Sequence, residues 1–294
     1  KEDIWQKLDL DVPYDDVRFR KYISDLTKLI EAFLCQQIYD RDHLQQASHL
    51  IQAVTEKKIE KLYNSSVRTA RRFSQDYAHK SSAFYYYNYS IENNYYRLAD
   101  FETKRDEKSN FESISNNLDY FYISEKLRIL CSILSRHNVV AHQYNILIQN
   151  EIIEFVANNT HHFEDIPAVS IYFQIYQTIT DPEDESHYFL LKQLLDQYAL
   201  LFPIEEATEM YTYAQNYCVR KINQSNQKFV NELFLLYKVL LEKKIIIADG
   251  FLSPWYFRNI TTVALRIGEY DWTEQFINEY QHNLPESFRD NAVK

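Results

Sequence analysis

Histidines are the side chains that most often serve as metal ligands or general bases near neutral pH. His137 and His142 lie five positions apart, and His161 and His162 are adjacent. Neither spacing is the i, i+4 pair that sets two imidazoles on one face of a zinc-binding helix, and no cysteine stands at ligand spacing from them. We therefore interpret these histidines as loop and surface residues and predict no metal site.

Carboxylates gather at 181–185 and at 205–209. Acidic groups at helix starts complement the helix dipole, whereas paired-carboxylate hydrolysis needs a separation in space that sequence spacing cannot give. No serine lies in a G-x-S-x-G elbow, and Cys35, Cys131 and Cys218 lack C-x-x-C spacing, so we interpret the cysteines as small core residues with reduced thiols. We expect no catalytic residue, and an enzyme with an unrecognised site between helices stays as an alternative.

Glycine is nearly missing from the 294 residues, which include only Gly250 and Gly268. Neither glycine belongs to a G-x-G or G-K-[ST] pattern, and phosphate-cradling loops are built from such patterns. The sequence therefore disfavours α/β folds of the Rossmann and P-loop kinds, and we expect no cofactor.

A basic stretch at 57–80 is unusual within this acidic chain, since it holds seven Lys or Arg and two acidic residues. Arg68, Arg71 and Arg72 follow i, i+3, i+4 spacing and so share one helical face, which is an arrangement that grips phosphates or an acidic peptide. The simpler interpretation is an exposed face balanced by acidic residues elsewhere. An acidic partner protein and nucleic acid are the two functional alternatives.

A run of aromatic residues, Phe84-Tyr85-Tyr86-Tyr87-Asn88-Tyr89, follows the basic stretch. It places rings all around a helix, and such a helix is either buried or covered by a partner. With 25 Tyr in the chain, core packing is the simpler explanation. Because tyrosine is also enriched at interfaces and stacks on bases, we name Tyr85, Tyr86 and Tyr89, together with the three arginines, as candidate partner-binding residues.

The net charge of −10 and the pI of about 5.4 disfavour broad attraction to nucleic acid or anionic lipid, which require a positive surface. No apolar run approaches the roughly 20 residues that span a bilayer, so we expect no membrane span and a cytoplasmic protein. The mean hydropathy of −0.48 indicates a large wetted surface, as an elongated helical array would have.

Apolar residues recur at helical spacing almost everywhere. In 1–141 the pattern predicts longer, less regular helices, the first carrying an apolar face from Phe19 to Leu34 and the others near 42–55, 58–77, 82–104 and 110–135. From 142 to 294 it predicts shorter helices with short polar breaks, several opened by proline, at 142–157, 167–179, 185–200, 204–221, 226–244, 254–268 and 271–283. Short amphipathic helices with short loops pack as antiparallel pairs, and each pair stacks on the next.

The segment 254–287 has a first helix, a Gly268-Glu269-Tyr270 turn, a second helix and a closing Pro285. Its apolar and small positions are Phe257, Ile260, Ala264, Thr273, Ile277 and Tyr280. This segment resembles one tetratricopeptide repeat (TPR), with Phe257 where the family usually has Trp, Thr261 where it has Gly and Thr273 where it has Ala. The match covers one repeat of about 34 residues.

The sequence thus predicts an all-α protein of antiparallel helix pairs stacked into a right-handed, TPR-like superhelix, a solenoid. We expect one continuous array that continues past Lys294 in the natural protein. The resemblance implies a non-enzymatic scaffold that binds a peptide or partner protein, of unknown identity, in a concave face. A nucleic-acid-associated repeat protein using the 57–80 face is the alternative, and the overall charge counts against it.

Overall fold

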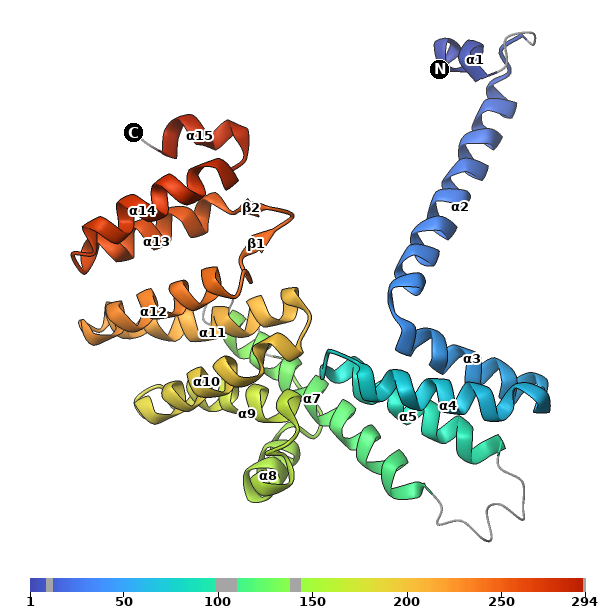
Figure 1. The fold of residues 1–294 in the computed structure, drawn as a ribbon, viewed down its shortest axis with the longest axis horizontal. Coiled ribbons are helices and arrows are strands. Elements are labelled where there is room, and N and C mark those ends of the chain that lie inside the picture. The colour runs from blue at the N-terminus through green and yellow to red at the C-terminus, as the bar shows by residue number, and fades with distance from the viewer. Residues whose placement is uncertain (9–12, 99–109, 138–143, 293–294) are drawn as a thin grey trace. The chain divides into compact units, whose positions relative to one another are not determined.

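The computed structural model describes residues 1–8, 13–98, 110–137 and 144–292, and nearly all of their regular structure is α-helical (Figure 1). The expectation of an all-α protein is therefore confirmed. None of the helices in these ranges combines the length and apolar character needed to cross a membrane.

The chain divides into two compact units, and each is described by itself. The first unit comprises Lys1–Tyr77 and Tyr87–Ile114, and the second comprises Ala78–Tyr86 and Ser115–Lys294. We expected the change from longer to shorter helices at 141/142. This position lies within 138–143, which is outside the described residues, and it belongs to the sequence range of the second unit.

The first unit begins with a short helix and a long one, followed by a hairpin of two helices. Its helices are α1 (Glu2–Leu8), α2 (Asp16–Arg41), α3 (His43–Lys57), α4 (Glu60–Asp76) and most of α5 (Ser82–Leu98). Asp15 and Asp42 cap α2 and α3, since each carboxylate accepts hydrogen bonds from two backbone N–H groups of the first turn. The buried core between α3 and α4 includes Leu44, Ile51 and Val54.

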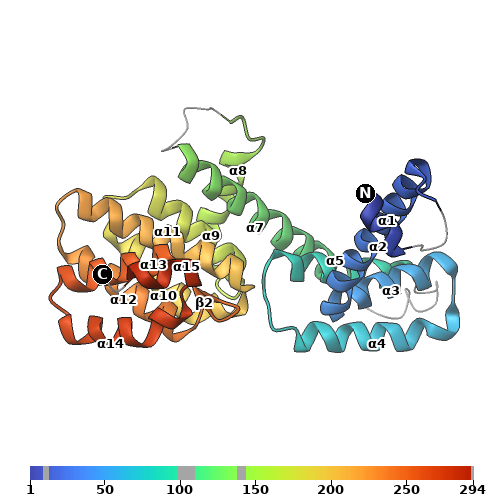
Figure 2. The same ribbon diagram turned by 90° about the horizontal axis from the view of Figure 1, so that it is seen from above.

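The second unit contains α7 (Phe111–His137) from Ser115 onward, α8 (Gln149–Asn158) and three helix pairs. The pairs are α9 (Pro167–Thr180) with α10 (Glu185–Tyr198), α11 (Ile204–Asn223) with α12 (Lys228–Glu242), and α13 (Pro254–Arg266) with α14 (Tyr270–Tyr280). Successive pairs pack on each other through contacts of α11 with α9 and α10, and of α13 with α12 (Figures 1 and 2). The short helix α15 (Glu286–Ala292) follows α14.

The turn between α13 and α14 depends on Gly268, whose φ of +84° is in the left-handed region. Gly268 N–H donates to the Leu265 carbonyl at 3.1 Å, and Glu269 N–H donates to the Ala264 carbonyl at 3.0 Å. This pair of bonds is the Schellman motif, which satisfies the last carbonyls of α13 and needs a residue that tolerates positive φ. The glycine identified in the resembling repeat is therefore a helix terminator.

The helices expected from periodicity and proline are present, with shifted ends. Pro167 and Pro254 stand in the first turns of α9 and α13, as predicted. The helix expected at 142–157 begins at Gln149, and parts of the spans expected at 82–104 and 142–157 lie outside the described residues. The sequence did not predict α1, the 3-10 helix Thr160–His162 or a two-stranded hairpin of β1 (Ile247–Ala248) and β2 (Phe251–Leu252).

Candidate functional site

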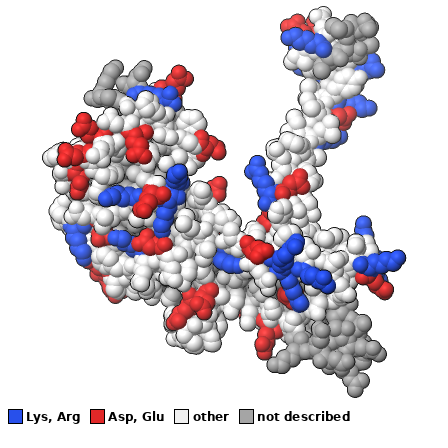
Figure 3. All heavy atoms as spheres, viewed as in Figure 1, with Lys and Arg blue, Asp and Glu red and all other residues white. Residues whose placement is uncertain are grey.

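The three arginines of the basic stretch lie on α4 in the first unit, and all three are exposed. Figure 3 shows Lys and Arg atoms gathered over the surface around α4. Arg68 and Arg72 form no ion pair with any other described residue, although the Arg72 guanidinium lies 5.3 Å from the centre of the Phe73 ring. These two cations are thus available to an anionic partner.

Arg71 is already engaged within the first unit. Its Nε lies 3.5 Å from Glu92 Oε1, and its guanidinium carbon lies 4.5 Å from the centre of the Tyr95 ring. Tyr95 in turn stacks on Tyr63, with ring centres 6.1 Å apart and nearly parallel planes. Arg71 therefore joins α4 to α5, so the expected arginine trio consists of one structural residue and two exposed ones.

The structure separates the candidate tyrosines by burial. Tyr85 is 5% exposed and packs edge-to-face against Tyr120 in the core of the second unit. It is therefore a core residue, which corrects its candidacy as a partner-binding residue. Tyr86 is 46% exposed and contacts Phe121, and Tyr89 is half-buried in the first unit. The aromatic run surrounds its helix, as expected, and only part of it reaches the surface.

A feature whose exposure the sequence did not reveal is the apolar face of α2. Eight large apolar side chains along this helix are 42–68% exposed, namely Tyr22, Ile23, Leu26, Leu29, Ile30, Phe33, Leu34 and Ile38. We call this set the α2 stripe. In Figure 3 much of the surface of α2 is white, that is, uncharged. Cys35 on the same helix is exposed as well, which corrects its interpretation as a core residue.

Both ends of α2 are anchored inside the first unit. At the start, Trp5 of α1 is buried, stacks on Tyr22 with ring centres 5.7 Å apart, and covers Phe19 together with Tyr14. At the end, the Tyr39 carbonyl accepts a hydrogen bond from Gln46 of α3. The α2 stripe is the largest set of exposed apolar side chains on any one described helix.

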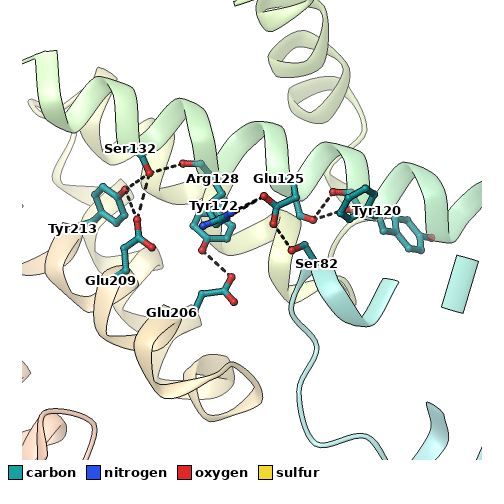
Figure 4. Close-up of polar contacts among 11 residues, drawn as sticks. Ser82, Tyr120, Glu125, Arg128, Ser132, Tyr172, Glu206, Glu209 and Tyr213 are labelled. Carbon is teal, nitrogen blue, oxygen red and sulfur yellow. Dashed lines mark hydrogen bonds and ion pairs between the residues drawn. The ribbon is translucent and has the colours of Figure 1, made fainter. Parts of the chain in front are cut away.

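A polar cluster joins α7, α9 and α11 within the second unit (Figure 4). Glu125 accepts from Arg128 Nη2 at 2.7 Å and also from the hydroxyl of Ser82. Glu209 accepts from Ser132 and Tyr213, each at 3.3 Å. Each carboxylate is thus occupied by donors of the same fold, and the arrangement connects helices.

Burial shifts the acidity of Glu206 in this cluster and of two buried cysteines in the second unit. Burial raises the pKa of Glu206, although a hydrogen bond from Tyr172 and the nearby charge of Arg128 oppose the shift. Burial likewise raises the pKa of the Cys131 thiol and raises that of Cys218 to about 12. Both buried thiols therefore stay protonated at neutral pH and are poor nucleophiles.

Asp181, Asp184 and His187 bring three potential metal-ligand atoms within 4.8 Å of one another. The sequence indicated the two aspartates as helix-start residues and missed His187, which follows at D-x-x-D-x-x-H spacing. Gln174 Nε2 donates to the His187 carbonyl at 3.0 Å and lies 3.2 Å from His187 Nδ1. Because this amide donates toward Nδ1, it favours the His187 tautomer that carries its proton on Nε2. Nε2 is the atom that faces both aspartates. In this tautomer Nε2 has no free lone pair to coordinate a metal.

A groove of about 550 Å³ lies beside α13 and α15. Its walls carry Trp255, Phe257, Leu284 and Phe288, with Arg258 as the charged residue. Trp255 is 71% exposed. The groove is mostly apolar, and its described lining residues include no pair of groups arranged for acid–base or nucleophilic chemistry.

Comparison of this chain with protein-family models, curated proteins and solved structures yields no match.

Proposed function

We propose that this protein is a non-enzymatic interaction module that binds a partner protein through the α2 stripe. The observation that carries the proposal is the exposure of eight large apolar side chains, at 42–68%, along one face of a 26-residue helix. Contiguous apolar surface of this kind on a water-soluble protein marks an interaction site. A helix gains most of its stability from packing against other elements. We therefore expect α2 to be more stable when a partner covers the stripe than when the stripe faces water.

The second unit serves in this proposal as a TPR-like scaffold. Three observations support the assignment: the consecutive packing of the pairs α9–α10, α11–α12 and α13–α14, the Schellman turn at Gly268, and the repeat resemblance at 254–287. Helical arrays of this type present extended surfaces to partner proteins.

Two charges placed on the α2 stripe test the proposal. Leu26→Glu with Ile30→Glu puts carboxylates on the stripe, whereas the matched control Ser24→Glu with Ala32→Glu puts them on the polar face of the same helix. Ser24 and Ala32 are both exposed. We expect proteins that co-purify with wild type, a second copy included, to remain with the control and to be lost with the stripe variant. Equal recovery from both variants contradicts the proposal.

Binding of nucleic acid is a second candidate, favoured by the exposure of Arg68 and Arg72 and by the stacked tyrosines beside Arg71. It predicts retention of single-stranded nucleic acid that decreases with salt and is lost in Arg68→Ala/Arg72→Ala. Binding that changes with neither salt nor these substitutions eliminates this candidate.

A further inference from the structure

We infer that the partner covering the α2 stripe is a second copy of this chain, with the two α2 helices packed antiparallel. This inference rests on the proposed function and specifies its partner. It follows from three properties of α2: the symmetry of its apolar positions, the distribution of charge on its flanks, and the area that the stripe offers.

The apolar positions are symmetric about Leu26. Ile23 and Leu29 lie three residues on either side of it, and Tyr22 and Ile30 lie four residues on either side. When two α2 helices run antiparallel with Leu26 opposite Leu26, Ile23 of each copy lies opposite Leu29 of the other. An interface with twofold symmetry needs this self-complementarity, since one surface must fit itself.

The exposed stripe continues C-terminally from its centre through Phe33 to Ile38. In the antiparallel pair, Phe33 of one copy reaches the region where α1 of the other copy covers Phe19. Ile4 of α1 is 52% exposed, so α1 carries an apolar side chain that is open to contact. The interface thus includes α1 as well as α2.

The charged flanks favour the antiparallel orientation over the parallel one. At 3.6 residues per turn, Arg20 and Glu31 lie on the same flank of the stripe, and Arg18 lies on the other. Antiparallel packing brings Arg20 of each copy beside Glu31 of the other, within about one residue of the same height. Glu31 thereby joins the ion pair that Arg20 Nη2 already forms with Asp16 Oδ2 of its own helix at 2.6 Å. Parallel packing brings Arg18 beside Arg20 instead, and that places like charges together.

The antiparallel arrangement brings Asp25 of one copy close to Asp25 of the other copy, along one flank of the stripe. Its carboxylate is already paired, because Lys28 Nζ lies 3.6 Å from Asp25 Oδ1 on the same helix. This local pair offsets the repulsion between the two aspartates, so the flank as a whole is close to neutral.

The area is sufficient for a stable pair. Half-exposed side chains of this size leave on the order of 80 Å² each, so the stripe offers roughly 650 Å² per copy and roughly 1,300 Å² in total, within the range of specific interfaces. The stripe runs from Tyr22 to Ile38, about 25 Å along the helix axis, and the two ends of α2 beyond it contact α1 and α3.

The primary experiment is sedimentation equilibrium of the full chain at micromolar concentration. We expect wild type and Ser24→Glu/Ala32→Glu to sediment as particles of twice 35.4 kDa, and Leu26→Glu/Ile30→Glu to sediment as a monomer. The substituted residues are exposed in the single chain, so we expect the variants to keep the helix content of wild type. Circular dichroism checks this.

Orientation is tested by charge reversal and by crosslinking. Glu31→Arg alone is expected to weaken dimerisation, and Arg20→Glu/Glu31→Arg is expected to restore it. In a Cys35→Ser background, chains carrying Ile23→Cys are expected to form disulfides with chains carrying Leu29→Cys under mild oxidation. Crosslinking of Ile23→Cys with itself in preference to Leu29→Cys overturns the antiparallel arrangement.

The outcomes separate this inference from the function on which it rests. A wild-type monomer whose stripe still captures a different protein overturns the second-copy inference and leaves the interaction function standing. A wild-type monomer whose stripe variants lose no partner overturns both. A dimer that survives Leu26→Glu/Ile30→Glu unchanged overturns the assignment of the interface to α2.

Discussion

The hydroxyl of Tyr172 on α9 donates a hydrogen bond of 2.8 Å to Oε1 of Glu206 on α11, and this bond connects two successive helix pairs. Tyr172 is 1% exposed, and its pKa is raised by burial and by the negative charge of Glu206. The tyrosine therefore remains a donor at all physiological pH values. It supplies a partner for a carboxylate that burial would otherwise destabilise.

The raised pKa of Glu206 predicts how stability depends on pH. A carboxyl whose pKa is higher in the folded than in the unfolded state stabilises the fold when it is protonated. This contribution to stability is lost as the pH rises from the pKa of the unfolded state through that of the folded state. Glu206→Gln keeps an oxygen that accepts from Tyr172 and removes the ionisation. We expect it to be more stable than wild type at pH 7, with the difference shrinking toward pH 4.

Urea unfolding of both proteins at pH 4 and pH 7 measures that difference. Glu205→Gln is the matched control, because Glu205 is exposed on the same turn of α11. A Glu206→Gln protein less stable than wild type at pH 7 shows that the ionised carboxylate is favoured in the folded state, contrary to the shift described above.

Tyr85 and Tyr86 form a natural pair for testing burial, since they are adjacent in α5 and 5% and 46% exposed. Tyr85→Ala removes a buried ring and is expected to cost about 3–5 kcal/mol. Tyr86→Ala loses an exposed ring contact with Phe121 and is expected to cost about 1 kcal/mol or less. Free energies of unfolding from denaturant titration check both values, and equal losses contradict the assignment of Tyr85 to the core.

Replacing Arg71 is expected to lower the stability of the protein more than replacing Arg68 on the same helix. Arg71→Ala removes the contact with Tyr95 and the ion pair with Glu92, at a cost of about 0.5–1 kcal/mol. Arg68→Ala, at an exposed position, is expected to change stability by less than about 0.5 kcal/mol. Thermal unfolding of the two variants in low salt distinguishes them, and a larger effect for Arg68→Ala contradicts the geometry.

Gly268 tests the Schellman turn between α13 and α14. A Cβ at this position meets nothing closer than 4.0 Å, so the cost of Gly268→Ala comes from the positive φ alone and is expected to be about 1–2 kcal/mol. Gly268→Asn is expected to cost less, because asparagine adopts left-handed backbone more readily. Denaturant unfolding measures both, and an alanine variant as stable as wild type excludes backbone strain as the reason for glycine here.

The sequence indicated the helices reliably because periodicity and helix-terminating residues are local signals. Pro167 and Pro254 marked helix starts, and Gly268 marked an end, since each acts through its own backbone. Helix α1 and the β1–β2 hairpin escaped prediction. Their segments are too short to display a period, and what orders α1 is the contact of Trp5 with α2.

The candidate site was harder to predict, because residue type does not report burial. The arginine spacing correctly placed three cations on α4, yet only the contacts with Tyr95 and Glu92 distinguish Arg71 from Arg68 and Arg72. Tyr85 and Tyr86 are identical in type and adjacent in sequence, and the packing of Tyr120 against one of them decides which ring is buried.

The sequence by itself determined that this protein is all-α and where its main helices lie, because helix formation follows from periodicity, capping and the scarcity of glycine. Only the tertiary structure decided which apolar faces are covered. The pattern from Phe19 to Leu34 predicts an amphipathic helix in either case, since periodicity shows that a face is apolar and says nothing of what packs on it. In the described chain, Phe19 is buried beneath Trp5 and Tyr22 stacks on the same ring, while the apolar side chains from Ile23 onward are exposed, and this difference carries the proposed function.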